Sequence, residues 1–338
     1  MLIARPATLK DGPALIELAK QAGPGFTSLA VSEDALLSRL KRSIATFGSP
    51  SGRRPDDIYM LMLEDLETEK VVGLSAVKAM IGIKDPFFNF RILKIAQNSN
   101  VVARRFDMDV LIMVNDYGGS TEVGSLFVSA DSRGTGAGRL ISQSRYMLMA
   151  TEPERFGDQV ISELRGHVEP DGTAPFWEAI GRKFFQMDFK EADQISASKD
   201  NQFIIDLMPK HPIYVELLAE EAKSVIAQTH PEGVGARRLL EKEGFRFDGV
   251  IDIFDAGPLV SCPRHDLETI KTSRHVKVIA QDKISDSCGK ALISNDRLSD
   301  FRSIVAPFKW SNSDIMISRG AYDALKISDN HIVRICEL

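Results

Sequence analysis

The sequence has few cysteines and no long apolar run. Its three cysteines are widely spaced and form no Cys-x-x-Cys pair: Cys262, Cys288 and Cys336. This number and spacing fit neither a disulfide framework nor a zinc site, so we expect a reduced, cytoplasmic protein without a metal. No apolar stretch approaches the roughly 20 residues that cross a membrane. The N-terminal residues also lack the apolar core of a signal peptide.

An excess of positive charge is absent as well. The chain has 42 Lys and Arg against 47 Asp and Glu, a net charge of −5, and this balance argues against nucleic acid as the main partner. With 43% hydrophobic and 26% charged residues, the composition is that of an ordinary globular protein. A length of 338 residues corresponds to about two domains.

The most informative segment is residues 126–139, LFVSADSRGTGAGR. A β-rich run at 123–128 leads into it, and a helical pattern at 140–150 follows. A glycine-rich turn between a strand and a helix leaves backbone N–H groups uncovered at the helix N-terminus, and such a turn holds phosphate or pyrophosphate.

Three kinds of phosphate loop contain such glycines. A Walker loop requires a lysine followed by Ser or Thr, which is absent here. In a Rossmann turn the third glycine comes one residue later, and no convincing acidic residue follows at the expected distance. Arg133, Gly136 and Gly138 have the spacing Arg-x-x-Gly-x-Gly of an acyl-CoA pyrophosphate loop. The alternative is a plain turn whose glycines only permit positive φ.

Periodicity and turn residues predict a mixture of helices and strands. Helices are expected at residues 13–21, with Asp11 as the cap, and at 33–47, 175–184, 213–227 and 236–243. Strands are expected at 1–6, 59–64, 71–79, 109–114, 160–165 and 250–254, with short strands after about residue 270. Loops or turns are expected at 22–29, 48–57 and 115–120.

Residues 175–189 and 236–247 form a weak internal repeat. Each segment reads as a helix with an acidic residue, then a glycine, then an aromatic strand. Two copies about 60 residues apart suggest duplication of a supersecondary unit, with chance similarity as the equal alternative.

Two further segments resemble the GNAT superfamily of N-acetyltransferases. Residues 3–11, IARPATLKD, precede an apolar helix as at the start of that fold. Residues 240–245, LEKEGF, resemble the turn from helix to strand near its end. Both segments support the acyl-CoA interpretation of the glycine turn.

Over nearly its whole length the chain resembles the arginine N-succinyltransferase family. The most specific segments are 207–214, LMPKHPIY, then His230-Pro231, 240–246 and 251–255. Shorter ones are 25–29, 85–86, 89–91, 115–116, 119–122, 175–177 and 184–189. The resemblance implies transfer of succinyl from succinyl-CoA to the α-amino group of L-arginine.

The resemblance also implies an α+β fold of tandem acyl-CoA N-acyltransferase (GNAT-like) domains with mixed central sheets. Three consecutive segments are predicted. Residues 1–200 form a GNAT-like domain with the pyrophosphate loop, 201–272 a second, partial GNAT-like unit packed on the first, and 273–338 a small β-rich segment.

The co-substrate site is predicted along the strand and the turn. Backbone N–H groups at Leu126, Phe127 and Val128 are expected to stabilise the oxyanion of the thioester carbonyl, and the resemblance implies that Leu126 contacts succinyl-CoA. The residues expected to hold the pyrophosphate are Arg133, Gly134, Gly136, Gly138 and Arg139.

The resemblance further implies that His230 is the proton donor. Histidine titrates near neutral pH, so its ring can give or take a proton under working conditions. His230 lies between a helical run and Pro231, where a side chain can face a cleft. A capping or core histidine is the alternative.

Substrate contacts are predicted from charge. A guanidinium binds a carboxylate through two hydrogen bonds, so Arg165 is a candidate for the succinyl carboxylate, with Arg91 as its competitor. His211 either lines the site or belongs to a rigid Pro-Lys-His-Pro corner. The acidic candidates for arginine are Asp116, Glu122, Asp252 and Asp255. A purely structural ion pair is the alternative for each.

Substrate preference and assembly stay open at this point. The resemblance implies that some relatives are paired α and β subunits that also accept ornithine, so the chain is expected to be a homo-oligomer or one subunit of such a pair. Tyr117 stands where the family is expected to have histidine. N-acetylation of another amine with acetyl-CoA and a non-catalytic CoA-binding subunit are the rival functions.

Overall fold

The computed structural model describes residues 1–23, 28–29, 31–198, 202–285, 288–328 and 331–338. Part of the predicted loop at 22–29 and of the matching segment at 25–29, as well as the predicted boundary after residue 200, lie outside these residues. The chain divides into two compact units. Unit 1 comprises Met1–Met80, Thr121–Asp158 and Pro263–Leu338, and unit 2 comprises Ile81–Ser120 and Gln159–Cys262. The three predicted segments do not coincide with these units, because the chain enters unit 2 twice.

Unit 1 is built on one long sheet. Its described strands lie in the order β12-β15-β11-β14-β13-β1-β2-β3-β6. Their bounds are β1 (Leu2–Pro6), β2 (Ile58–Asp65), β3 (Lys70–Lys78), β6 (Thr121–Val128), β11 (Arg274–Gln281), β12 (Lys290–Ser294), β13 (Ser303–Ser311), β14 (Asp314–Ser318) and β15 (Ile332–Glu337). β1 joins the C-terminal strands to the others, because Ile3 pairs with Ile304 of β13 and with Glu64 of β2.

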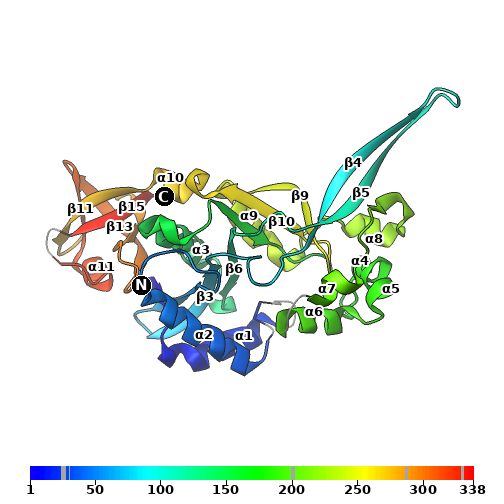
Figure 1. Cartoon of the computed structure of the whole chain (residues 1–338). Coiled ribbons are helices and arrows are strands. Elements are labelled where there is room, and N and C mark those ends of the chain that lie inside the picture. The colour runs from blue at the N-terminus through cyan, green and yellow to red at the C-terminus, as the bar shows by residue number, and fades with distance from the viewer. Residues whose placement is uncertain (24–27, 30, 199–201, 286–287, 329–330) are drawn as a thin grey trace. The chain divides into compact units, whose positions relative to one another are not determined.

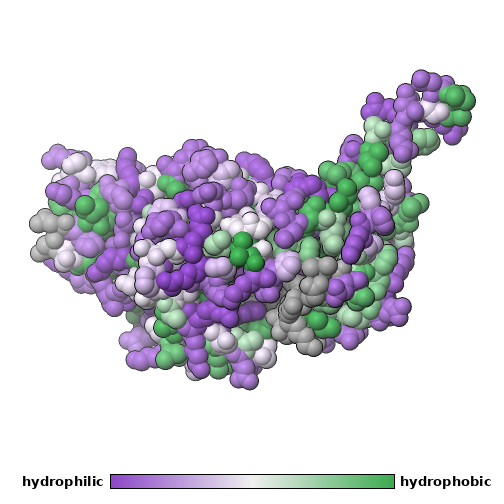
Figure 2. Space-filling view, viewed as in Figure 1, coloured by the Kyte–Doolittle hydropathy of each residue, from purple (hydrophilic) through white to green (hydrophobic). Residues whose placement is uncertain are grey.

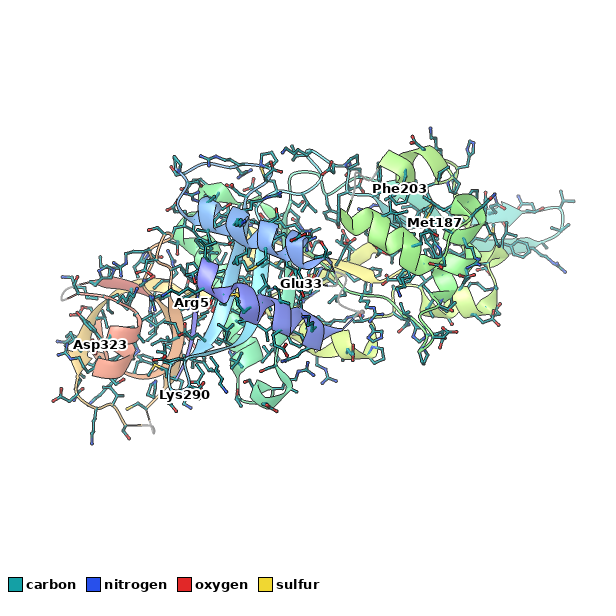
Figure 3. The ribbon with its side chains drawn as sticks, turned by 90° about the horizontal axis from the view of Figure 1, so that it is seen from below. Arg5, Glu33, Met187, Phe203, Lys290 and Asp323 are labelled. Carbon is teal, nitrogen blue, oxygen red and sulfur yellow. The ribbon has the colours of Figure 1, made fainter. Side chains whose placement is uncertain are left out.

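Helices cover both faces of this sheet. α1 (Gly12–Ala22) and α2 (Glu33–Phe47) lie next to each other on one face (Figure 3), where Leu15 and Leu40 share a core with Leu74 of β3. α3 (Ala137–Thr151) lies on the other face, where Ser75 Oγ donates a hydrogen bond to the carbonyl of Ile141 at 3.3 Å. Successive residues of a strand point to opposite faces, so Leu74 and Ser75 mark the two layers.

The C-terminal part of unit 1 is rich in strands, as expected. It contains β11 to β15 together with the short helices α10 (Glu268–Thr272) and α11 (Arg319–Ala324). These elements enclose a core of their own, which includes Val276, Ile293, Ile315, Tyr322 and Ile335.

In unit 2, helices pack against strands (Figure 1). Its described strands lie in the order β7-β10-β9-β4-β5-β8. They are β4 (Asn89–Ser99), β5 (Arg104–Val114), β7 (Gln159–Glu163), β8 (Ile213–Tyr214), β9 (Arg246–Asp252) and β10 (Pro258–Pro263). The helices are α4 (Pro175–Ala179), α5 (Gly181–Phe185), α6 (Phe189–Ser198), α7 (Gln202–Leu207), α8 (Glu220–Val225) and α9 (Val234–Lys242). Trp177 of α4 is fully buried and shares a core with Phe90, Leu111 and Ile251 of the sheet.

The α+β class predicted from the sequence is confirmed, and most predicted elements are present with ends shifted by a few residues. The helix predicted at 213–227 is wrong over its first half. Ile213 and Tyr214 form β8 because they pair with Leu111 and Val110 of β5, and only Glu220–Val225 is an α-helix.

Two other local predictions need correction. The helix predicted at 175–184 is two short helices, because the chain turns at Ile180, which has φ −122° and ψ −72°. The strand half of the first internal repeat is absent, since Phe185 ends α5 and Phe189 begins α6. Asp11 precedes α1 as predicted, but its carboxylate accepts hydrogen bonds from Arg5 and from Thr8 N and does not cap that helix.

Candidate active site

Strand β6 of unit 1 contains an irregularity just before the glycine turn. Leu74 pairs with Phe127, whereas Ala76 pairs with Gly124. β6 therefore has one residue more than β3 in this stretch, which is a β-bulge at Ser125 and Leu126. Ser125 has φ +50°, a left-handed conformation that non-glycine residues rarely adopt. A bulge leaves its extra residue without a partner in the ladder, and this one lies next to the segment where the oxyanion donor was expected.

The turn after the bulge is exposed and open. Gly134 and Gly136 have φ +79° and +92°. A Cβ built at either of them, or at Gly138, would meet no heavy atom within 4 Å. Gly136 directly precedes α3, a helix of 15 residues, so the first N–H groups of α3 have no partner within the helix. Uncovered N–H groups at the positive end of a helix are suited to a phosphate.

Two arginines flank this turn with donors to spare. Arg133 is exposed, and its Nε donates to the carbonyl of Val128 at 3.0 Å. Arg139 is also exposed, and its Nε donates to Gln143 Oε1 at 3.1 Å. Each guanidinium has further N–H groups for an anion. Glu122, by contrast, is held in an ion pair by Lys78 at 2.8 Å.

In unit 2, the end of β7 and the turn after β9 cross in direct backbone contact. The carboxylate of Asp255 accepts hydrogen bonds from Gly166 N and Gly257 N, both at 2.8 Å. A Cβ at Gly257 would lie 2.0 Å from the carbonyl oxygen of Leu164, and a Cβ at Gly166 would lie 2.2 Å from that of Asp255. Only glycine fits these two positions.

This crossing positions His230. The N–H of His230 donates to the carbonyl of Arg165 at 2.8 Å, and the N–H of Ala227 donates to the carbonyl of Ala256 at 2.9 Å. The side chain is 17% exposed. Its Nδ1 accepts a hydrogen bond from Glu232 N at 3.3 Å, so the neutral ring carries its proton on Nε2.

The surroundings of His230 favour the neutral ring. Burial lowers the pKa of His230 from its usual 6.5, and the positive charge of Arg165 lowers it further. The carboxylates of Glu232 and Asp255 act in the opposite direction without reversing the shift. Glu232 Oε2 is 3.8 Å from Nδ1 and is therefore placed near the atom that gains a proton when the ring becomes charged.

The structure separates the two candidates for the succinyl carboxylate. Arg91 is occupied, because its Nε donates to Asp116 Oδ2 at 2.9 Å and its Nη1 donates to the carbonyl of Asp248 at 3.4 Å. Arg165 is partly buried, and in the described part of the chain its guanidinium has no hydrogen-bond or ion-pair partner. A partly buried cation without a partner favours binding of an anion.

The acid that ends β9, Asp252, and Asp255 in the turn after it both bind backbone N–H groups. Asp252 Oδ1 accepts hydrogen bonds from Phe254 N at 2.7 Å and Asp255 N at 2.9 Å. Removal from water raises the pKa of Asp252 well above its usual 3.8, and the charges of Asp255 and Glu163 raise it further. Burial raises the pKa of Asp255 as well.

Opposite Asp252 in the ladder lies a buried acceptor without a donor among the described residues, Asn89 Oδ1. Asn89 of β4 lies opposite Asp252 in the ladder with β9, and its Nδ2 donates to Glu163 Oε1 at 2.8 Å. Asn89 Oδ1 is buried and has no donor within hydrogen-bond distance among the described residues. We call Asn89, Glu163 and Asp252 the acceptor cluster, and a cationic group is its chemical complement.

The remaining predicted residue, His211, is not joined to these groups. It is exposed in the turn before β8, and no hydrogen bond or ion pair connects it to another described residue. Tyr117, which departs from the expected histidine, donates through its hydroxyl to Asp248 Oδ2 at 2.8 Å, and burial raises its pKa to about 12.

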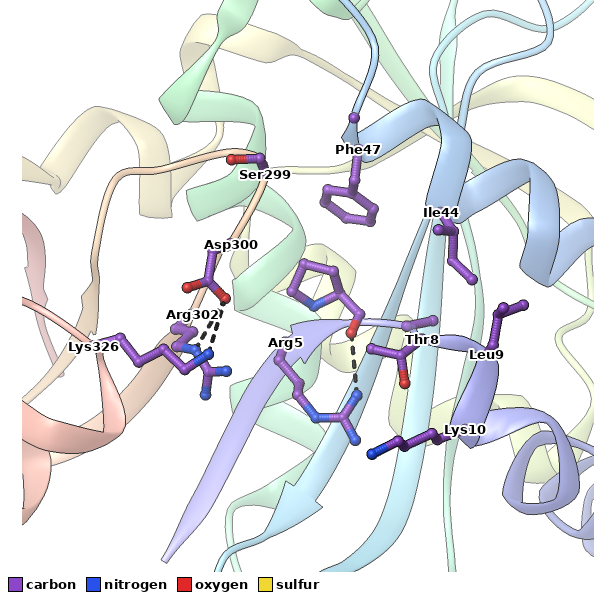
Figure 4. A pocket seen from close by; sticks show the side chains of 13 residues that line it. Arg5, Thr8, Leu9, Lys10, Ile44, Phe47, Ser299, Asp300, Arg302 and Lys326 are labelled. Atoms are coloured by element: carbon purple, nitrogen blue, oxygen red, sulfur yellow. Dashed lines mark hydrogen bonds and ion pairs between the residues drawn. The ribbon is translucent and has the colours of Figure 1, made fainter.

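A cavity of about 640 Å³ lies elsewhere in unit 1 (Figure 4). Its charged side chains are largely paired: Arg5 binds Asp11, and Asp300 binds both Arg302 and Lys326. None of the predicted site residues lines this cavity, so we assign it no part in the site.

Sequence reasoning missed several residues of the site. Ser125, Glu163 and Glu232 carry no motif of their own, and Asn89 was noted only within the matching segment 89–91. A bulge, a ladder and a turn single out these residues. Within the described ranges, no group of three or more His, Cys, Asp or Glu side chains is arranged to hold a metal ion. No helix in those ranges is long and apolar enough to cross a membrane.

Comparison with known proteins identifies the family. The family model described as “Arginine N-succinyltransferase beta subunit” matches residues 2–269. The chain belongs to the arginine N-succinyltransferase family. Relatives named arginine N-succinyltransferase from Escherichia coli O139:H28 and Shigella flexneri are 37% identical to it over 340 residues, which are 100% of this chain and 98% of each relative. The resemblance stated from the sequence is confirmed.

A solved structure of this family agrees over the same length. It is the arginine/ornithine succinyltransferase subunit AI from Pseudomonas aeruginosa, with a TM-score of 0.89 and 32% sequence identity. The match covers 100% of this chain and 98% of that chain. Membership of an arginine N-succinyltransferase family makes this chain an acyltransferase.

Alanine at position 257 is expected to destabilise the protein by about 3 kcal/mol or more, because its Cβ would force two backbone segments apart. The measurement is unfolding in urea. The matched control is Gly235→Ala in α9, where a Cβ meets no atom within 4 Å and a gain of up to about 1 kcal/mol is expected. Equal stability of the two variants would contradict the crossing.

The charges around His230 are expected to move its pKa in opposite directions. Arg165→Gln removes a cation and raises the pKa of His230, whereas Glu232→Gln removes an anion and lowers it. An NMR titration of the imidazole Cε1–H in both variants and in the wild type measures the shifts. Shifts of the same sign would contradict the described environment.

Proposed function

We propose that this chain is an arginine N-succinyltransferase, which transfers the succinyl group of succinyl-CoA to the α-amino group of L-arginine. The observation that carries the proposal is the 37% identity, over the whole chain, to relatives named for this activity. The aligned length includes both the glycine turn of unit 1 and the His230 region of unit 2.

In this proposal succinyl-CoA binds through its pyrophosphate at the N-terminus of α3. The exposed N–H groups, the open space at Gly134, Gly136 and Gly138 and the spare donors of Arg133 and Arg139 support this assignment. CoA supplies the thioester, and the protein supplies positive ends of dipoles and cations for the phosphates.

The thioester carbonyl is activated by backbone N–H groups of Leu126 to Val128. The bulge at Ser125 and Leu126 supports this role, because its extra residue has no pairing partner in β3. One donor aimed at a developing oxyanion contributes about 2.7–4 kcal/mol to lowering the barrier in other acyl transfers.

His230 is proposed as the proton donor to the departing thiolate. The C–N bond forms as the C–S bond breaks, the amine loses one proton, and the CoA thiolate gains one. The protonated ring donates from Nε2. Its Nδ1–H replaces the hydrogen bond that the neutral ring accepts from Glu232 N, and the carboxylate of Glu232, 3.8 Å from Nδ1, lies near this proton. A lowered pKa makes the imidazolium a stronger acid, and the proton lost by the amine restores it.

Each substrate carries a charge that complements a group of unit 2. We propose that Arg165 binds the succinyl carboxylate, because its guanidinium has no partner among the described residues. The acceptor cluster and the neighbouring Asp255 are proposed for the positive charge of arginine. Asp116 and Glu122 rank lower because Arg91 and Lys78 hold them, and His211 ranks lower because it is isolated.

The proposal also includes the cellular location of the enzyme and its binding partners. We propose a cytoplasmic enzyme whose partners are the two small substrates, without metal, nucleic acid or membrane. A second candidate acceptor is ornithine, favoured by the P. aeruginosa structure of an arginine/ornithine succinyltransferase subunit at 32% identity.

The test is a CoA-release assay that crosses succinyl-CoA and acetyl-CoA with arginine, ornithine and lysine. We expect the highest kcat/KM for succinyl-CoA with arginine, since both charged subsites are then filled. Absence of turnover with succinyl-CoA and any of the three amines would refute the proposal.

The variant Asp252→Asn tests the acceptor cluster in the same assay. Asparagine keeps an Oδ1 acceptor for Phe254 N and Asp255 N but cannot ionise when a cation is bound. We expect the KM for arginine to rise about tenfold or more, as for a lost hydrogen bond to a charged group, and the KM for succinyl-CoA to stay unchanged. An equal rise in both constants would indicate a general structural defect.

A further inference from the structure

β4 and β5 form a two-stranded arm beyond the rest of the unit 2 sheet, which we define as residues 92–109. β9 pairs with β4 only at residues 89–91, and β8 pairs with β5 only at residues 110–111. In the described part of the chain no other strand pairs with either one. Figure 1 shows the two strands extending well past the helices of unit 2.

The two faces of the arm differ in character. Paired residues of an antiparallel ladder share a face, and the face alternates along each strand. Leu93, Ile95, Phe106 and Met108 therefore lie on one face, which we call the apolar face. The opposite face carries charged side chains, with ion pairs between Lys94 and Asp109 and between Arg105 and Asp107, each at 3.0 Å.

Much of the apolar face is open to solvent. Leu93 is 42% exposed and Phe106 54%, and at the tip Val101 is 96% and Val102 59% exposed. Figure 2 shows hydrophobic colour on the arm and at its tip. At the base the surface continues into Tyr214, which pairs with Val110 and is 37% exposed.

Such an arm requires a partner. A two-stranded ribbon alone is marginally stable in water, and contiguous exposed apolar side chains rimmed by polar ones mark contact surfaces. The unpaired strand edges add open hydrogen-bonding groups to the same region.

Charge on the apolar face indicates what this partner is. Arg104 lies on this face at the tip and has no ion-pair partner in the described residues. At the base, Asp116 is bound to Arg91, which lies on the same face, and its side chain is 45% exposed. The face thus carries the Arg91–Asp116 ion pair at its base, mostly apolar residues with Gln97 in its middle, and the cation Arg104 at its tip.

A surface of this pattern complements itself. If two copies pack antiparallel with Ile95 and Met108 at the twofold axis, the Leu93–Val110 pair of each lies over the Gln97–Phe106 pair of the other, and Arg104 approaches Asp116. Self-complementary patches of this kind make twofold dimers. We propose that the apolar face of the arm binds the same face of a second copy of this chain. This inference is independent of the reaction.

The test begins with the mass of the purified full chain by light scattering after size-exclusion chromatography, at several concentrations. We expect twice the 37.4 kDa of one chain. Leu93→Asp is expected to yield a monomer, since it puts a charge into the apolar contact. Ala96→Asp on the opposite face is the matched control and is expected to stay dimeric.

A cross-link tests the axis directly. Ile95→Cys places a thiol beside its own symmetry mate, so oxidised glutathione is expected to give a disulfide-linked dimer on a non-reducing gel. Ala96→Cys and the wild type, which retains the partly buried Cys288, are expected to give none. A monomeric wild type, a dimer unaffected by Leu93→Asp, or equal cross-linking at positions 95 and 96 would overturn the proposal. A paired homologous subunit is then the occupant to examine.

Discussion

In unit 2 the end of β7 and the turn after β9 touch through their backbones, with Gly166 and Gly257 at the contact. Asp255 fastens both segments by accepting one N–H from each glycine. Arg165 directly precedes Gly166 in this contact. Its backbone carbonyl accepts a hydrogen bond from the N–H of His230. The positions of His230 and Arg165 therefore depend on this backbone contact, which a Cβ at either glycine would prevent.

The electrostatic character of unit 2 follows from this arrangement. Arg165 has no anion bound to it among the described residues, while the buried Asn89 Oδ1, opposite Asp252 in the ladder, has no donor among them. Uncompensated groups of this kind are costly inside a protein unless a ligand supplies the missing charge. Succinyl and arginine carry one such group each, an anion and a cation. Unit 1 contributes a different kind of site, in which a bulge is followed by a glycine turn at a helix N-terminus. Such a site suits the thioester and the phosphates of an acyl-CoA.

Some of these features can be predicted from the sequence and others cannot. The turn at residues 133–138 was predictable because its glycines, its preceding strand and its following helix are contiguous. His230 was predictable only through resemblance, since a histidine before a proline has no distinctive spacing. The meeting of Asn89, Glu163 and Asp252 was not predictable, because they come together from strands far apart in sequence. The failed helix at 213–227 has the same origin: pairing of Tyr214 with Val110 overrides a local helical pattern.

The central claim is that CoA binding and proton transfer are separate tasks, assigned to the glycine turn and to His230. The most direct test is single-turnover succinyl transfer by His230→Ala, with the dissociation constant of CoA measured on the same sample. The account predicts a transfer rate at least about 100-fold lower, as for loss of a general acid, with an unchanged affinity for CoA. A wild-type transfer rate, or loss of CoA binding together with the rate, would contradict it.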